Sequence, residues 1–138
     1  MVLEAAKAIE DDALIARAKT IAIQVADTFI NEAIDNDGGV LNEKNLDTNH
    51  TDYDKHWWPQ VEALVGLKYA FEIDKNECYL EFKRNIWDFT KKHLIDYKHG
   101  EWHFRVNQNG KPYKIEDKVS MWKAPYHTAR ALMVLTKN

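Results

Sequence analysis

The sequence is short of the residues that interrupt helices or cross-link chains. Its 138 residues include five glycines, three prolines and one cysteine. Few glycines and prolines favour a mostly helical fold. A single cysteine excludes an internal disulfide and fits the reducing cytosol, so we expect a cytoplasmic protein. Cys78 has no obvious histidine partner, and we interpret it as a buried structural thiol.

The sequence also lacks long apolar segments and a large net charge of one sign. No segment approaches the roughly 20 apolar residues that a membrane-spanning helix needs. Residues 1–7 lack the basic and apolar blocks of a secretory signal peptide. The net charge of −3 gives no reason to expect the concentrated basic surface that binds nucleic acid. We therefore expect neither a membrane nor a nucleic-acid partner.

The apolar residues that are present recur every three or four positions, as on the buried face of a helix. Asp11 or Asp12 is expected to cap one such helix, because a carboxylate accepts hydrogen bonds from the free N–H groups of the first turn. Pro59 and Pro125 suit the first turn of two others. The helices are predicted over residues 1–9, 12–34, 59–72 and 77–94 and from Pro125 onward. The polar residues 42–54 are predicted to form a long loop.

A short β-hairpin is predicted between helices near residues 101–116. Apolar and polar side chains alternate over residues 102–106, as in a strand. Asn109-Gly110 favours a hairpin turn, which places the return arm near residues 113–115.

The two halves of the chain resemble each other, which indicates an internal repeat. The paired positions are Asp11 with Asn76, Gly39 with Gly100, and Pro59 with Pro125, at offsets of 65, 61 and 66 residues. Each repeat is a pair of helices with a decorated loop, and stacked pairs bury faces that one pair leaves open. We therefore expect part of an α/α toroid. The helices after Trp58 and Trp122 would be inner ones that begin at the same rim, with Trp58 and His127 near one pocket.

His127 and the tryptophans are the candidates for chemistry. His127, in the first turn of the last helix, is either a helix-start histidine bonded to a neighbouring backbone group or a general acid/base, since the histidine pKa lies near neutral pH. Trp57 and Trp58 either pack in the core or stack on a sugar ring, and one of them can do each. Glu62, four residues after Trp58, either favours the helix dipole or holds sugar hydroxyls.

Metal and nucleotide sites have little support. His99 and His103 span a predicted turn and strand, so their spacing is not that of a helical ligand pair, and we predict no metal site there. The sequence has no GxGxxG, P-loop or GxSxG motif.

Three motifs follow one another in the sequence: Asp54-Lys55-His56-Trp57-Trp58-Pro59-Gln60-Val61-Glu62-Ala63-Leu64, His99-Gly100-Glu101-Trp102, and Trp122-Lys123-Ala124-Pro125-Tyr126-His127-Thr128-Ala129-Arg130. In this order they resemble the N-acylglucosamine 2-epimerase family, and in detail its cellobiose 2-epimerase branch. The resemblance covers essentially the whole chain. It implies an (α/α)6 barrel, of which residues 1–138 would be a single partial domain, the C-terminal segment.

The resemblance also implies a reaction and a site. The reaction is cofactor-free inversion at C2 of a reducing-end sugar, by proton removal to an enediolate and proton return to the opposite face. His127 matches a catalytic histidine of the family. Trp58 and Trp122 match aromatics that flank the sugar, and Glu62 matches a polar contact. Trp57 is included as a further sugar contact.

The resemblance also implies that a second histidine is missing. The family's partner histidine belongs to a His-x-x-Glu motif just upstream of the helix that contains Leu3 here, and none of the six histidines of this chain takes that place. We therefore expect an incomplete epimerase, which by itself is inactive as an epimerase and buries its open barrel edges by self-association. Two alternatives remain: a 2-epimerase of N-acylglucosamine or mannose, and a non-catalytic carbohydrate-binding or assembly fragment. Hydrolysis is not expected, because Glu62 alone does not make the carboxylate pair of a glycosidase.

Overall fold

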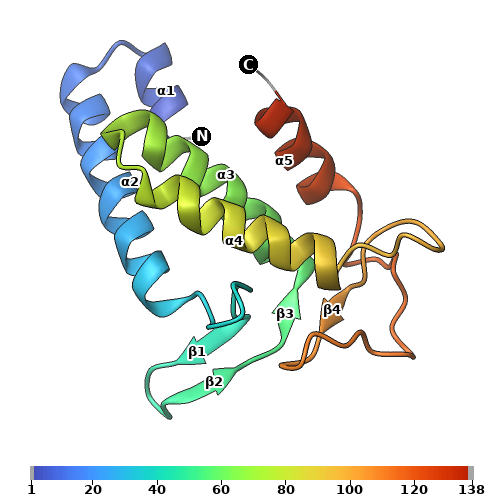
Figure 1. The fold of residues 1–138 in the computed structure, drawn as a ribbon. Coiled ribbons are helices and arrows are strands. Elements are labelled where there is room, and N and C mark those ends of the chain that lie inside the picture. The colour runs from blue at the N-terminus through green and yellow to red at the C-terminus, as the bar shows by residue number, and fades with distance from the viewer. Residues whose placement is uncertain (1, 137–138) are drawn as a thin grey trace.

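The computed structural model describes residues 2–136 and contains every helix that the apolar spacing predicts (Figure 1). The helices are α1 (Val2–Ala8), α2 (Asp12–Glu32), α3 (Trp57–Asp74), α4 (Cys78–His93) and α5 (Tyr126–Thr136). The predicted ends are therefore correct to within a few residues. Residue 1, which the first predicted helix includes, lies outside the described part.

The helix starts follow local hydrogen-bonding chemistry. The carboxylate of Asp11 accepts a hydrogen bond from the backbone N–H of Leu14 at 2.9 Å, so the predicted cap of α2 is confirmed. Asn76 accepts one from the backbone N–H of Cys78 at 3.1 Å, where α4 begins. Cys78 itself is only partly buried, because it stands in the first turn of α4 at the border of the core.

The polar stretch between α2 and α3 is more regular than predicted. β1 (Glu43–Asn45) pairs antiparallel with β2 (His50–Asp52), so the predicted long loop over residues 42–54 contains a short β-hairpin that the sequence did not indicate. The side chain of Asn45 accepts a hydrogen bond from the backbone N–H of Thr48, and Asn49 has a φ of 52°. Asparagine tolerates both roles, so polar residues alone can build a tight hairpin.

The segment 101–116 turns back at the predicted place, and Val106 forms an isolated bridge with Pro112. The longer pairing of β4 (Arg105–Val106), however, is to β3 (Lys55–His56), about 50 residues earlier in the chain. Sequence spacing did not reveal this pairing, because it joins two loops that only the packing of the helices brings together.

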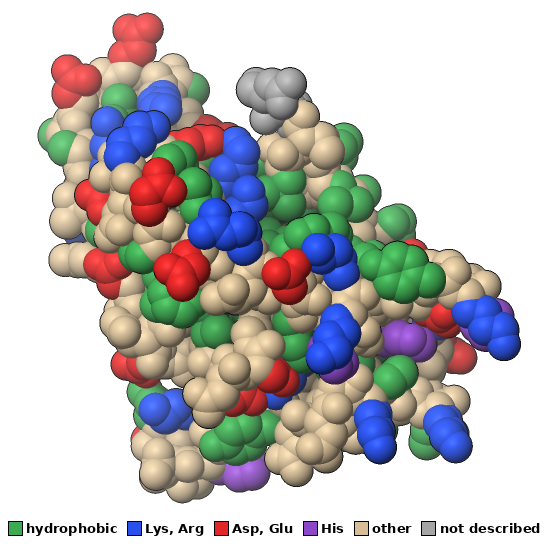
Figure 2. Space-filling model, viewed as in Figure 1, with side chains coloured by type: hydrophobic (Ala, Val, Ile, Leu, Met, Phe, Trp, Pro, Cys, Tyr) green, Lys and Arg blue, Asp and Glu red, His purple; other side chains and the backbone are tan. Residues whose placement is uncertain are grey.

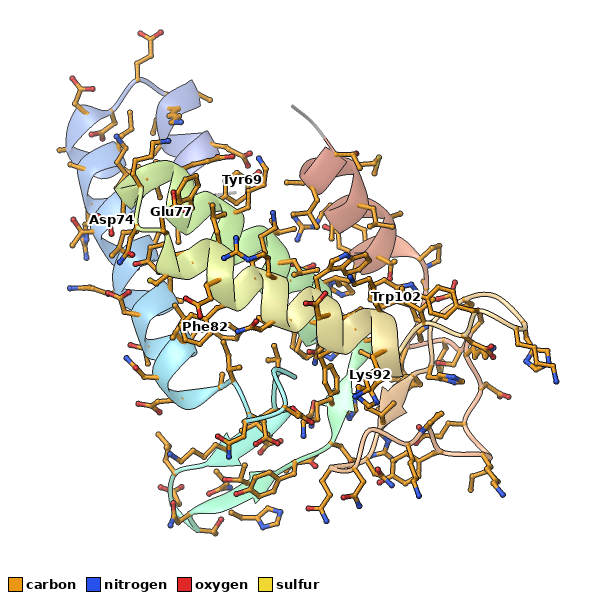
Figure 3. The ribbon with its side chains drawn as sticks, viewed as in Figure 1. Tyr69, Asp74, Glu77, Phe82, Lys92 and Trp102 are labelled. Atoms are coloured by element: carbon orange, nitrogen blue, oxygen red, sulfur yellow. The ribbon has the colours of Figure 1, made fainter. Side chains whose placement is uncertain are left out.

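α3 is the central helix. It packs against α2, α4 and α5 and buries residues on several sides, among them Val61, Leu64 and Leu67. One apolar cluster lies between α2, α3 and α4, where Phe82 packs, and a second lies between α3, α4 and α5, where Trp102 is buried (Figure 3). A helix enclosed in this way corresponds to the inner helix that the repeat predicts.

The repeat is visible in the loops that follow α2 and α4. Each opens with an isolated antiparallel bridge, Ile34 to Val40 in the first and Ile95 to Trp102 in the second. Each then contains a glycine with positive φ: Gly38 at 85° and Gly100 at 75°. The sequence pairs Gly39 with Gly100, but by conformation the counterpart of Gly100 is Gly38. Gly39 instead lies where an added Cβ would approach Phe89 to 2.9 Å.

Candidate functional site

α3 and α5 pack side by side and begin at the same end of the molecule, so the predicted common rim is confirmed. The ring of Trp58, at the start of α3, lies 6.0 Å from the ring of His127 between centroids. Tyr126 lies edge-on to His127 at 5.2 Å. Two motifs that are 65 residues apart thus meet at one place on the surface.

Glu62 is the centre of this group. One of its carboxylate oxygens lies 2.7 Å from Nδ1 of His127, and the other accepts a hydrogen bond from the guanidinium of Arg130. All three side chains are between one quarter and two fifths exposed, at 30%, 38% and 26%. Both oxygens of Glu62 are therefore engaged by other side chains, and the carboxylate orients His127.

The contact with Glu62 has a chemical consequence for His127. A carboxylate only accepts hydrogen bonds, so Nδ1 carries the hydrogen and Nε2 keeps the lone pair of the neutral ring. A carboxylate on the far nitrogen of a general base fixes its tautomer and stabilises the imidazolium that forms on proton uptake. The geometry thus favours the acid/base alternative for His127 over a bond to a backbone group.

The tryptophans have different positions. Trp58 is 41% exposed beside His127, whereas Trp57 is 3% exposed and packs on the ring of Phe104 at 4.8 Å. This burial favours the packing alternative for Trp57. Trp122 is 79% exposed on the segment that leads to α5.

The segment that carries Trp122 is anchored by a buried lysine that sequence reasoning did not single out. Lys123 is 2% exposed, and its Nζ lies 2.6 Å from a carboxylate oxygen of Glu101 and 2.7 Å from the carbonyl oxygen of Lys118. Burial raises the pKa of Glu101, but the hydrogen bond from Lys123 and other favourable contacts outweigh it, and the net pKa is lowered. This ion pair holds the residues just before α5, and so the position of His127.

Arg130 was also missed as a site residue, although it belongs to the third motif. It follows His127 by three residues, which puts both side chains on one helix face. The sequence places the carboxylate of Glu62 near the start of the neighbouring inner helix. That carboxylate was a signal that a cation on this face of α5, such as Arg130, would form an ion pair.

An open groove of about 1020 Å³ begins at this site. Trp58 and Glu62 line one end, α1 lines part of it, and its walls are the facing sides of α2 and α3. Tyr69 of α3 lines it near α1, where its hydroxyl lies 3.2 Å from Glu4 (Figure 3). The wall residues are mostly apolar, and this groove did not follow from the sequence.

Two further properties concern residues 2–136 only. Within them, no group of three or more His, Cys, Asp or Glu side chains is arranged to hold a metal ion. None of their helices is both long and apolar enough to cross a membrane.

Comparison with known proteins connects this geometry to a family. The model of the N-acylglucosamine 2-epimerase (GlcNAc 2-epimerase) family matches residues 1–131. A cellobiose 2-epimerase of Bacteroides fragilis is 37% identical over 132 residues, which are 96% of this chain and 33% of that protein.

Solved structures agree in fold. A sugar epimerase from a ruminal bacterium superposes with a TM-score of 0.90 at 27% identity, over 97% of this chain and 34% of its own. The cellobiose 2-epimerase of Bacillus thermoamylovorans superposes with a TM-score of 0.77 at 34% identity, over 82% of this chain and 29% of its own. The fold is thus part of an (α/α)6 barrel, and the chain spans about a third of the length of the relatives that it matches. With its match over nearly the whole sequence, the chain belongs to the N-acylglucosamine 2-epimerase family.

Proposed function

We propose that this chain is a partial domain of a sugar 2-epimerase that inverts C2 of a reducing-end aldose such as cellobiose. The observation that carries the proposal is the hydrogen bond of 2.7 Å between His127 Nδ1 and Glu62, beside the exposed ring of Trp58. It joins a proton-transfer group, its orienting carboxylate and a flat apolar surface for a sugar ring.

In the proposed reaction the sugar opens to its aldehyde form, which acidifies the C2 proton. Nε2 of His127 takes this proton, the electrons of the C–H bond form a C1–C2 double bond, and the π electrons of the C1 carbonyl move onto its oxygen to give an enediolate. Glu62 stabilises the resulting imidazolium, and Arg130 keeps the carboxylate in place. A proton returned to the opposite face of C2 completes the inversion. Only protons move, so the reaction needs no cofactor.

The substrate is proposed to be a sugar with a free reducing end. Cellobiose is the first choice, because the relatives named above include cellobiose 2-epimerases. Mannose is one alternative, since a D-mannose isomerase superposes with a TM-score of 0.81 at 25% identity, and N-acylglucosamine is another, since the family model is that of N-acylglucosamine 2-epimerase. Trp58 and Trp122 would flank the sugar, and Trp57 would support Trp58 from the core.

A single His127 limits what this chain does by itself. One base can exchange the C2 proton on one face, but inversion needs a second proton donor on the other face. We propose that the isolated chain catalyses exchange without inversion, and that a complete site needs groups from outside one copy.

Proton exchange in D₂O tests this function. For the chain diluted until it is a monomer, we expect deuterium at C2 of cellobiose by NMR without accumulation of the C2 epimer, and a loss of roughly 10²- to 10⁴-fold in exchange rate for His127→Asn. His50→Asn, at an exposed position on β2, is the matched control and should keep the rate. Inversion by the monomer would contradict the incomplete site. Sugar binding with no exchange in the unchanged chain would favour a carbohydrate-binding fragment.

We also propose that copies of the chain associate through their open edges in the cytosol, with a sugar as the small-molecule partner and without nucleic acid or membrane. The support is the set of large apolar side chains exposed on α2 and α5, which include Val25 and Met133 at 61% and 60%. Such surfaces are usually covered by a partner.

A further inference from the structure

The open groove between α2 and α3 has the shape and chemistry of a helix-binding site. Its α2 wall is apolar at three- and four-residue spacing: Ala18, Ile21, Ala22, Val25, Ala26 and Phe29. Ile21 and Val25 are 46% and 61% exposed, so the chain does not cover this wall itself. Amphipathic helices bind such grooves through residues spaced i, i+3, i+4 and i+7.

The α3 wall includes three small residues, Ala63, Gly66 and Ala70, among larger ones such as Trp58 and Tyr69. Gly66 stands in the middle of α3, and a Cβ added there would meet nothing within 4 Å. Glycine destabilises a helix interior relative to alanine, and it is used where another chain segment approaches the backbone closely. Within residues 2–136 no segment does so at Gly66.

α5 carries an apolar stripe that fits this groove. Its Ala131 is fully buried against the rest of the chain. Its other face exposes Ala129, Leu132, Met133 and Thr136, which have the spacing i, i+3, i+4 and i+7. Leu132 and Met133 are 40% and 60% exposed, and hydrophobic side chains gather over α5 in Figure 2.

The repeat indicates how α5 would lie in the groove. Subtracting the proline offset of 66 from α5 places it on residues 60–70 of α3, and adding the turn offset of 65 to α1 places it on residues 67–73. α5 and α1 thus correspond to the first and last parts of one inner helix, and α1 already lines the groove. In this alignment α5 and α1 overlap by about one helical turn, so one of the two helices must unwind that turn when α5 docks.

We propose that α5 of one copy docks in the groove of a second copy, end to end with α1, and that three copies close a ring. This deepens the self-association proposed above and rests on it. Each copy contributes α2 and α4 as outer helices and α3 as an inner one, and α5 with the neighbour's α1 forms the next inner helix. Three copies then give six inner and six outer helices, the number in an (α/α)6 barrel.

The ring has a consequence for the site. His127 begins α5, so each copy brings one imidazole to the same rim of a shared interior. Docking therefore places proton-transfer groups from different copies around one cavity, whereas a single copy has one such group at its rim.

Light scattering of the purified chain tests the ring. The expected mass is three times the 16.2 kDa of one chain. A monomer would overturn the ring together with self-association, and a dimer would overturn the ring alone. The measurement does not depend on catalysis, so an intact trimer without C2 exchange would contradict only the epimerase function.

Two variants test the groove itself. Gly66→Leu fills the closest approach, and the Cβ that it adds meets nothing within 4 Å in the described chain, so we expect unchanged helical circular dichroism and a shift from trimer to monomer. Met133→Glu should do the same from the opposite surface. Leu46→Glu, 79% exposed in the turn between β1 and β2, is the control and should stay trimeric. A trimer that survives Met133→Glu, or Gly66→Leu with its helices intact, would overturn the assignment of α5 to the groove.

Discussion

The loop that follows α2 and the loop that follows α4 are equivalent in the repeat, and they begin alike and end differently. In both, a lysine closes the turn after the outer helix: Lys55 binds Asp35 at 2.6 Å in the first loop, and Lys118 binds Asp96 in the second. The first loop then forms the β1–β2 hairpin, and Lys55 is fully buried. The second has only the two-residue strand β4 and isolated bridges, and Lys118 is 26% exposed.

The second loop also exposes large apolar side chains. Ile115, Met121 and Trp122 are 96%, 87% and 79% exposed. The same kind of lysine–aspartate ion pair thus anchors both loops. The first loop pairs with itself as a hairpin, whereas the second exposes apolar side chains that are available for further contacts. The second loop leads to His127, so the more open of the two carries the candidate chemistry.

Replacing the two anchoring lysines should give the largest difference in stability between the two loops. Lys55→Met leaves the carboxylates of Asp35 and Asp37 without their buried cation, and we expect a loss of about 3 kcal/mol in the free energy of unfolding. Lys118→Met should lose clearly less, because water reaches its ion pair. Urea denaturation measures both, and equal losses would show that the two anchors are not differently buried.

Alanine at the paired glycines has a smaller expected effect. At Gly39, a Cβ would lie 2.9 Å from both Lys55 Cγ and Phe89, so Gly39→Ala should cost about 2 kcal/mol by overpacking. At Gly100 the Cβ meets nothing within 4 Å, and only the φ of 75° resists the change, at about 1 kcal/mol. Thermal or urea unfolding of both variants ranks them, and a costlier Gly100→Ala would reverse our view of which loop is tightly packed.

The smallest expected effect is on the pH dependence of the unfolding free energy. Here we expect Asp96 of the second loop to contribute more than Asp35 of the first loop. The hydrogen bond from Lys118 and those from backbone N–H groups hold the pKa of Asp96 far below its usual range. Burial raises the pKa of Asp35, but hydrogen bonds from Lys55 and the Asn36 N–H outweigh it, and the net pKa of Asp35 is lowered.

A folded-state pKa below the unfolded value stabilises the protein above the unfolded pKa of about 4. This stability is lost as the pH falls toward the folded pKa. Asp96→Asn should therefore flatten the decline in unfolding free energy from pH 5 to pH 3 more than Asp35→Asn. Urea titrations at each pH give the two slopes, and a larger flattening by Asp35→Asn would refute the order.

Part of the site was predictable from the sequence. The spacing of apolar residues predicted the helices, and the repeat of prolines and tryptophans placed Trp58 and His127 at one rim, where their rings lie 6.0 Å apart. Lys123 was not predictable, because a lysine is usually exposed and only packing against Glu101 and Trp57 shows it buried. The pairing of β4 with β3 was missed for a similar reason.

The sequence by itself determined the helical class, the repeat and the residue types of the candidate site, since these depend on local spacing and on side-chain chemistry. Only the tertiary structure decided that Glu62 is shared between His127 and Arg130, that Trp57 is buried while Trp58 is exposed, and that a groove remains open along α3. Those outcomes depend on the angle and distance between helices, which arise when faces far apart in the chain pack together.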